Sequence, residues 1–169
     1  DINLIRRPVR VGFKAGALKY GLEKAKGDFI AIFDADFLPD SDFLKKTLPS
    51  FFNGDKIGVV QTRWGHINKK FSLLTKLQAL GLDAHFTVEQ VGRNVANHFI
   101  NFNGTGGVWS KECILDAGNW EQDTLTEDLD LSYRAQLKDW KFIYLEDVIA
   151  PAELPVSMPA LRSQQFRWM

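Results

Sequence analysis

Short apolar runs of strand length alternate along the chain with longer amphipathic stretches. Residues 29–33 (FIAIF), 57–61 (IGVVQ) and 141–145 (KFIYL) are such runs, bounded by turn-forming or charged residues. Because FIAIF is apolar throughout, we expect it to be a buried strand with parallel neighbours. Residues 99–107 (FINFNGTGG) predict one more short strand that leads into a glycine loop.

Helical patterns fill the intervals between these runs. Strands that alternate with helices predict an α/β layered domain with a mainly parallel sheet. NGDK, between residues 53 and 56, predicts the turn into the second strand, and Pro159 is placed to begin a terminal helix. The expected helices lie within residues 10–28, 40–52, 71–91 and 124–139, and from Pro159 onward.

Two of these helices carry an apolar stripe that should face the core. Gly27 stands where a glycine commonly ends a helix, so it is expected to end the first one. The stripes consist of Ala15, Leu18, Leu22 and Ala25 in the first helix, and of Leu74, Leu77, Gly81, Ala84, Val88 and Val91 in the third.

Composition and charge narrow the class of protein. The 169 residues are enough for one domain, and 45% hydrophobic with 25% charged residues indicates a globular one. Twenty-one basic and 21 acidic residues give no net charge, which argues against a nucleic-acid binder with a broad basic face. Cys113 is the single cysteine, so no internal disulfide can form and a reducing compartment is expected. No apolar run approaches the roughly 20 residues of a membrane span, so we expect a soluble piece.

Asp34 and Asp36 directly follow the first apolar strand run. Open α/β sheets bind ligands beyond the carboxyl ends of their strands, and an Asp-x-Asp turn can aim two carboxylates at one Mg²⁺ or Mn²⁺ that holds a diphosphate. The same residues also make ordinary turn chemistry, so the pattern alone leaves both interpretations open.

Thr126, Glu127 and Asp128 open the fourth predicted helix, and Asp130 follows. A threonine N-cap followed by acids is normal helix stabilisation, worth ~0.5–2 kcal/mol for the cap. A carboxylate at that place can equally accept a proton from a hydroxyl beside a metal diphosphate. Lys14, at a loop-to-helix junction, similarly suits either a phosphate contact or a solvated surface.

The order of these segments resembles a known family. Lys-Ala-Gly-Ala-Leu, Asp-Ala-Asp, Phe-Asn-Gly-Thr-Gly-Gly, Thr-Glu-Asp and Gln-x-x-Arg-Trp occur in turn. The set is similar to the inverting glycosyltransferases of family 2, and more closely to the processive, cellulose-synthase-like glucan and glucomannan synthases. The resemblance runs nearly end to end and implies a GT-A, Rossmann-like nucleotide-diphospho-sugar transferase fold.

The resemblance also implies roles for individual residues. Asp128 is the expected general base that deprotonates the acceptor hydroxyl. The donor nucleotide sugar is expected to contact Lys14, Asp34, Asp36 and Arg167, and the two aspartates are expected to hold Mg or Mn, with Asp36 the more direct ligand. The expected acceptor-binding residues are Phe102, Asn103, Gly104, Thr105, Gly106, Gln164 and Trp168, with Trp168 stacked on the glycan.

The resemblance implies a hexose transferred from UDP-glucose or GDP-mannose to the end of a growing β-glycan. Family members carry an earlier nucleotide-binding strand with a base-recognising aspartate, and transmembrane helices that flank this region. Asp1 lacks that motif context, so we expect residues 1–169 to be one partial catalytic domain, truncated at both ends. The full-length protein is then expected at the cytosolic face of a cell or internal membrane. The alternatives are a soluble, non-processive family 2 transferase and a non-catalytic module that binds a glycan or nucleotide sugar.

Overall fold

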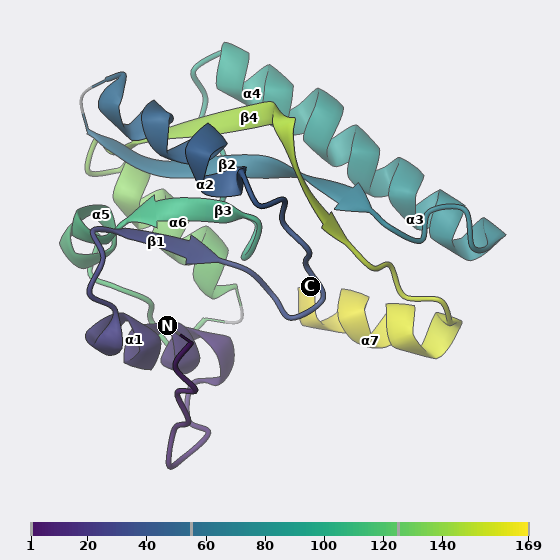
Figure 1. Cartoon of the computed structure of the whole chain (residues 1–169), viewed down its shortest axis with the longest axis horizontal. Helices are drawn as coiled ribbons and strands as arrows, with labels where there is room; N and C mark the ends of the chain where they lie inside the picture. The colour runs from purple at the N-terminus through teal and green to yellow at the C-terminus, as the bar shows by residue number, and fades with distance from the viewer. Residues whose placement is uncertain (1, 55, 125, 169) are drawn as a thin grey trace.

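The apolar runs assemble into a four-stranded sheet with the order β1-β3-β2-β4 (Figure 1). The strands are β1 (Phe29–Ile32), β2 (Ile57–His66), β3 (Gly107–Ser110) and β4 (Lys141–Ala152). β3 pairs antiparallel with β1 and β2, and β2 pairs parallel with β4, so three strands share one direction. The computed structural model describes residues 2–54, 56–124 and 126–168; Asp1 and Leu125 therefore lie outside the described part.

Helices cover both faces of this sheet, which confirms the α/β layered prediction. In Figure 1, α1, α5 and α6 lie on one side of the sheet and α2 on the other. The helical segments are α1 (Phe13–Lys24), α2 (Phe43–Thr47), the 3-10 helix η1 (Leu48–Phe52), α3 (Leu73–Ala84), the π-helix η2 (His85–Gln90), α4 (Val91–Val95), α5 (Lys111–Asp116), α6 (Glu127–Gln136) and α7 (Met158–Trp168).

Each face of the sheet has its own apolar cluster. Neighbouring residues of β3 point to opposite faces, so Trp109 joins the cluster beneath α1, α5 and α6, and Val108 joins the one beneath α2. Phe86 of η2 packs against Tyr144 of β4 in a third, smaller cluster. The predicted stripe of α1 does face the core, where Ala15 and Leu22 are buried.

Two strand predictions were wrong in detail. In the described sheet β3 lies between β1 and β2, so β1 is an end strand and its one partner is antiparallel. Ala31 of β1 is also exposed, so the strand is not buried throughout. The strand expected at residues 99–107 begins only at Gly107. The backbone N–H groups of Ile100 and Phe102 bond to side chains of α6, at 3.0 Å each, instead of to a neighbouring strand.

Two helix predictions also need correction. The first helix ends at Lys24 with Ala25 extended, and Gly27 does not adopt a left-handed conformation. The expected stripe of residues 71–91 is mainly on the wrong face, since Leu77 and Val88 are 58% and 69% exposed. The buried face consists of Thr75, Ala79, Phe86 and Gln90.

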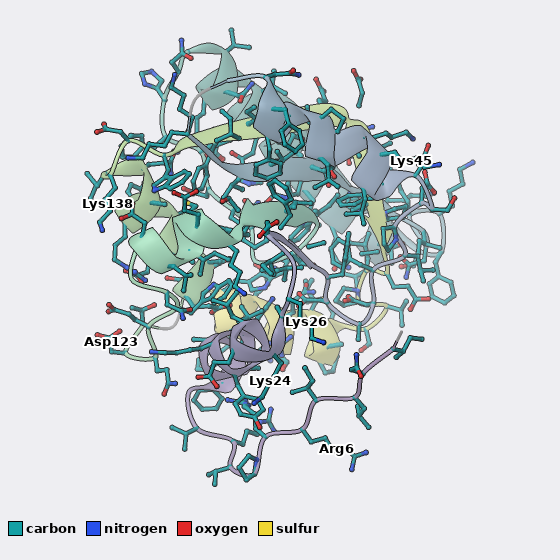
Figure 2. The ribbon with its side chains drawn as sticks, turned by 60° about the vertical axis from the view of Figure 1, so that its left-hand side comes forward. Arg6, Lys24, Lys26, Lys45, Asp123 and Lys138 are labelled. Carbon is teal, nitrogen blue, oxygen red and sulfur yellow. The ribbon has the colours of Figure 1, made fainter. Side chains whose placement is uncertain are left out.

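Charged side chains project outward from several elements. Figure 2 labels Lys24 at the end of α1, Lys26 just after it, Lys45 on α2 and Lys138 after α6, and all four are exposed. Across residues 2–54, 56–124 and 126–168, no helix is both long enough and apolar enough to cross a membrane.

Candidate functional site

The first turn of α1 and the end of β1 bring a lysine and an aspartate together. Lys14 Nζ lies 2.7 Å from Asp34 Oδ1, and the two side chains are 36% and 45% exposed. Asp34 lies two residues after the end of β1, and its backbone N–H donates to Thr105 Oγ1 at 2.8 Å. The predicted donor-binding residues Lys14 and Asp34 are therefore neighbours beside the glycine loop.

The glycine loop, residues 103–106, is held by side chains of β2. Gln61 Nε2 donates to the carbonyls of Thr105 and Gly106 at 3.3 and 3.2 Å, and Thr62 Oγ1 donates to Gly106 at 2.6 Å. Trp64 Nε1 donates to Thr105 O at 3.2 Å. The backbone N–H of Thr62 also donates to the Gly106 carbonyl, at 3.1 Å, so β2 holds both carbonyls and the loop has a fixed shape.

Asp128 approaches this loop from the start of α6. Gly104 has φ +78°, and a Cβ there would lie 3.0 Å from Asp128 Oδ2 and 3.4 Å from Lys14 Nζ. Lys14, Asp34 and Asp128 therefore converge around one glycine. Thr126 occupies the N-cap position as predicted, but its side chain makes no capping hydrogen bond in this described segment.

Burial is the main influence on the pKa values of Glu127 and Asp128, at the start of α6. It raises the pKa of Asp128, while the Leu129 N–H bond at 2.9 Å and the Lys14 charge partly oppose the rise. Burial also raises the pKa of Glu127, and the neighbouring Asp128 carboxylate adds to that rise. A raised pKa makes a carboxylate a stronger proton acceptor once it is ionised.

Asp34 and Asp36 fit a hard divalent cation whose other ligands come from a bound substrate. A turn with a 3.1 Å bond from Phe37 N–H to Asp34 O carries both aspartates, and Asp36 is exposed. Asp34 Oδ1 pairs with Lys14, so at most three of the four carboxylate oxygens of these two aspartates are available to a metal. The described residues contain no group of three or more His, Cys, Asp or Glu side chains able to enclose a metal. This donor set suits Mg²⁺ or Mn²⁺ completed by phosphate oxygens and water.

Helix α7 brings one of its predicted residues towards the loop. The Trp168 ring lies 6.1 Å from the Trp64 ring, whose indole N–H bonds to Thr105. Arg167 instead donates to Ser163 Oγ at 3.2 Å within α7, and among the described residues no ion pair joins it to Asp34 or Asp36. Gln164 is half-buried.

The acceptor loop divides into a buried and an accessible part. Phe102 is buried and packs on Trp109 with ring centroids 5.5 Å apart, so its ring belongs to the core. Asn103 is half-buried, and its side chain bonds to His85 and Gln90. His85 is not among the site residues predicted from the sequence. The i,i+4 spacing of His85 and Glu89 on a helix was the available signal for a paired histidine.

Comparison with known proteins identifies relatives along the whole chain. Residues 1–169 match the model of the family described as "Glycosyltransferase like family 2". The chain is 49% identical over 165 residues to the probable glucomannan 4-beta-mannosyltransferase 4 of Oryza sativa subsp. japonica, covering 96% of this chain and 30% of that protein. It is 48% identical over 171 residues to the glucomannan 4-beta-mannosyltransferase 1 of Cyamopsis tetragonoloba, covering 99% and 32%. The chain thus spans about a third of the length of these curated relatives.

Two solved structures share the fold at low sequence identity. A mannosyltransferase from Pyrobaculum calidifontis, in complex with GDP-Man and Mn²⁺, matches with a TM-score of 0.67 and 20% identity over 91% of this chain and 39% of that one. Glucosyl-3-phosphoglycerate synthase from Mycobacterium tuberculosis, in complex with Mg²⁺ and uridine-diphosphate, matches with a TM-score of 0.55 and 20% identity over 92% and 51%. These likenesses show the GT-A fold of nucleotide-sugar transferases.

Proposed function

Because this chain belongs to the glycosyltransferase family 2 group, we propose that it is the catalytic core of an inverting, processive β-glycan synthase. The full-length protein transfers a hexose from a nucleotide sugar to the end of a growing chain. The names of its curated relatives favour mannose from GDP-mannose, with glucose from UDP-glucose as the alternative donor.

The observation that carries this proposal is the convergence of Lys14, Asp34 and Asp128 around Gly104. Because Gly104 has no side chain, Asp128 Oδ2 and Lys14 Nζ both approach its backbone, to 3.0 and 3.4 Å from where a Cβ would lie. A sugar hydroxyl can therefore approach the Asp128 carboxylate while a diphosphate lies beside Lys14. An inverting transfer needs a base on one side of the anomeric carbon and anion stabilisation on the other.

In the proposed reaction the acceptor hydroxyl attacks the anomeric carbon and the bond to the diphosphate breaks. Asp128 accepts the hydroxyl proton, a contribution typically worth ~10²–10⁴-fold in rate. Lys14 places a positive charge beside the leaving group. Asp34 and Asp36 would hold Mg²⁺ or Mn²⁺, which neutralises charge on the diphosphate when bound. Arg167 remains a predicted donor ligand, and reaching the diphosphate requires it to leave Ser163.

Trp168 is the proposed platform for the acceptor glycan. Its ring is 43% exposed and lies against Trp64, which bonds to the glycine loop. An indole offers an apolar face to the C–H face of a pyranose. We further propose that segments outside this chain attach the protein to the cytosolic face of a membrane.

The decisive experiment is product analysis of the full-length protein in membranes with a panel of labelled nucleotide sugars. We expect a β-linked polymer from GDP-mannose or UDP-glucose, and none from the Asp128→Asn protein. Transfer of one sugar per acceptor would favour the non-processive transferase. Binding of a nucleotide sugar or glycan without any transfer would favour a non-catalytic module.

A further inference from the structure

The π-helix η2 directs two side chains at one loop residue. Asn103 Nδ2 lies 2.8 Å from His85 Nε2, and Gln90 Nε2 lies 2.9 Å from Asn103 Oδ1. His85 and Gln90 are five positions apart, so in an α-helix they would point roughly 140° away from each other. The wider turn of a π-helix brings them towards a common side. The π-helix therefore allows His85 and Gln90 to hydrogen-bond to Asn103 together.

The direction of every hydrogen bond in this group follows from one backbone carbonyl. Gln90 Nε2 also lies 3.0 Å from the carbonyl oxygen of Asn101, which can only accept, so this Gln90 atom is the amide nitrogen. Its other bond must then meet the oxygen of the Asn103 carboxamide, which turns the Asn103 nitrogen towards His85. His85 Nε2 must accept that bond, and so His85 is neutral here.

The remaining ring nitrogen of His85 connects to a carboxylate. With Nε2 as acceptor, His85 Nδ1 carries the proton and donates to Glu89 Oε2 at 2.8 Å. Arg93 Nη2 lies 2.9 Å from the other oxygen of Glu89. The hydrogen bond from His85 is the largest influence that holds the pKa of Glu89 below its usual range; burial opposes it and the Arg93 charge adds to it. Glu89 thereby fixes the tautomer of His85.

Asn103, at the end of this chain of bonds, is next in sequence to the glycine that lies against the candidate base. Asn103 precedes Gly104, whose missing side chain lets Asp128 Oδ2 come close, and the backbone N–H of Asn103 donates to Gln61 Oε1 at 3.0 Å. After the bonds to His85 and Gln90, the half-buried carboxamide keeps one N–H and one oxygen lone pair. A sugar hydroxyl both donates and accepts hydrogen bonds, so this pair of groups matches it.

We propose that Glu89 and His85 are positioning residues, which act through Asn103 to orient an acceptor-sugar hydroxyl beside Asp128. This inference rests on the proposed function, because it requires a sugar acceptor at that place. Neither residue touches the reacting atoms. Their contribution is to fix the carboxamide in the one orientation that leaves the N–H and the lone pair towards the sugar.

Two substitutions of the same histidine separate positioning from helix packing. In His85→Gln the side-chain oxygen can reach the place of Nε2 and accept from Asn103, whereas in His85→Asn the shorter amide reaches only the place of Nδ1. In the full-length protein, we expect His85→Asn to lower the polymerisation rate about tenfold or more and His85→Gln to stay within about threefold of wild type. The KM for the nucleotide sugar should change less than twofold in both. Arg93→Ala is the matched control, because it removes an ion pair of Glu89 but leaves the bond to His85.

A double-mutant cycle tests whether His85 acts through Asn103. His85→Asn should cost little further activity in an Asn103→Ala background, and the shifts in unfolding midpoint of the same four proteins should be non-additive. Equal activity losses in His85→Gln and His85→Asn, or additive effects in the cycle, would show that His85 does not act through Asn103. A wild-type protein that makes no polymer from any donor would refute the proposed function. The shifts in unfolding midpoint would still show, by being additive or non-additive, whether His85 and Asn103 are coupled.

Discussion

Lys14 Nζ in the first turn of α1 lies 2.7 Å from Asp34 Oδ1 beyond the end of β1, with both side chains more than a third exposed. An exposed pair of this kind contributes about 0–1 kcal/mol to stability. Its position beside the glycine loop therefore matters more for the ligand than for folding.

Lys14→Ala should leave the protein folded but weaken its hold on the nucleotide sugar. Loss of one charged contact to a diphosphate is worth about 1.5–3 kcal/mol, so the donor KM should rise roughly tenfold or more. The measurement is donor KM together with the unfolding midpoint of the full-length protein. Lys19→Ala, also in α1 but on its exposed side, is the control and should change neither quantity. A fall in stability without a change in KM would contradict a donor role for Lys14.

The pH dependence of turnover should report the environment of Asp128. Because burial raises its pKa above the ordinary 3.8, the carboxylate needed as base forms only at a higher pH. The acid limb of the rate profile should lie above the ordinary range of aspartate. Lys14 opposes the rise, so Lys14→Ala should move that limb to still higher pH. A limb at the ordinary value in wild type would argue against Asp128 as the base.

The same pKa shift predicts the stability of Asp128→Asn. When the folded-state pKa of an acid is raised, both states are protonated well below pH 3.8 and no penalty exists there. As pH increases through the folded-state pKa, the buried charge costs the folded state free energy. Asp128→Asn keeps an oxygen for the Leu129 N–H and removes that charge. It should therefore unfold at a higher temperature than wild type at neutral pH, and the difference should vanish at low pH.

Gly104→Ala should damage the site more than the fold. The substitution puts a side chain at φ +78°, at an expected cost of about 1–2 kcal/mol, and places its Cβ 3.0 Å from Asp128 Oδ2. Displacing the base by about 1 Å can cost roughly 100-fold in kcat. Gly118→Ala is the matched control, with φ +92° and a Cβ 3.2 Å from Arg134 Nη1. If both variants lose similar stability and only Gly104→Ala loses turnover, Gly104 is needed for the position of Asp128. Equal turnover in the two variants would refute that role.

The sequence predicted the layers of the fold better than the contacts within them. Apolar runs and the α1 stripe identify core elements because the side chains buried there are mainly apolar. In α3 and η2 the pattern misleads, since the buried face includes Thr75 and Gln90, whose side chains hydrogen-bond, while Leu77 and Val88 are exposed. Hydrophobicity alone cannot recognise a face that is buried through hydrogen bonds.

The candidate site shows the same division between residue type and geometry. Motif order brought Lys14, Asp34 and Asp128 to attention, and the structure brings these three together at Gly104. Nothing in the spacing could indicate that His85 reaches Asn103, because that contact depends on a π-turn, and a helical pattern does not reveal one. Likewise, spacing places Trp168 and Arg167 side by side, but only a fold can show that one faces Trp64 and the other Ser163.

Trp168→Ala should impair elongation of the glycan more than donor binding. The Trp168 ring lies 6.1 Å from Trp64 and is 43% exposed, so a sugar can reach it beside the loop that carries Asn103. Aromatic contacts of this kind contribute about 0.5–1.5 kcal/mol, so product length or rate should fall up to about tenfold. Phe166→Ala truncates an aromatic ring that is 80% exposed on the same helix, and it is the control for loss of an aromatic from α7. Chain-length analysis of the product and donor KM, measured on both variants, decide the matter. If Trp168→Ala raises donor KM as much as it shortens the product, the residue does not act as an acceptor platform.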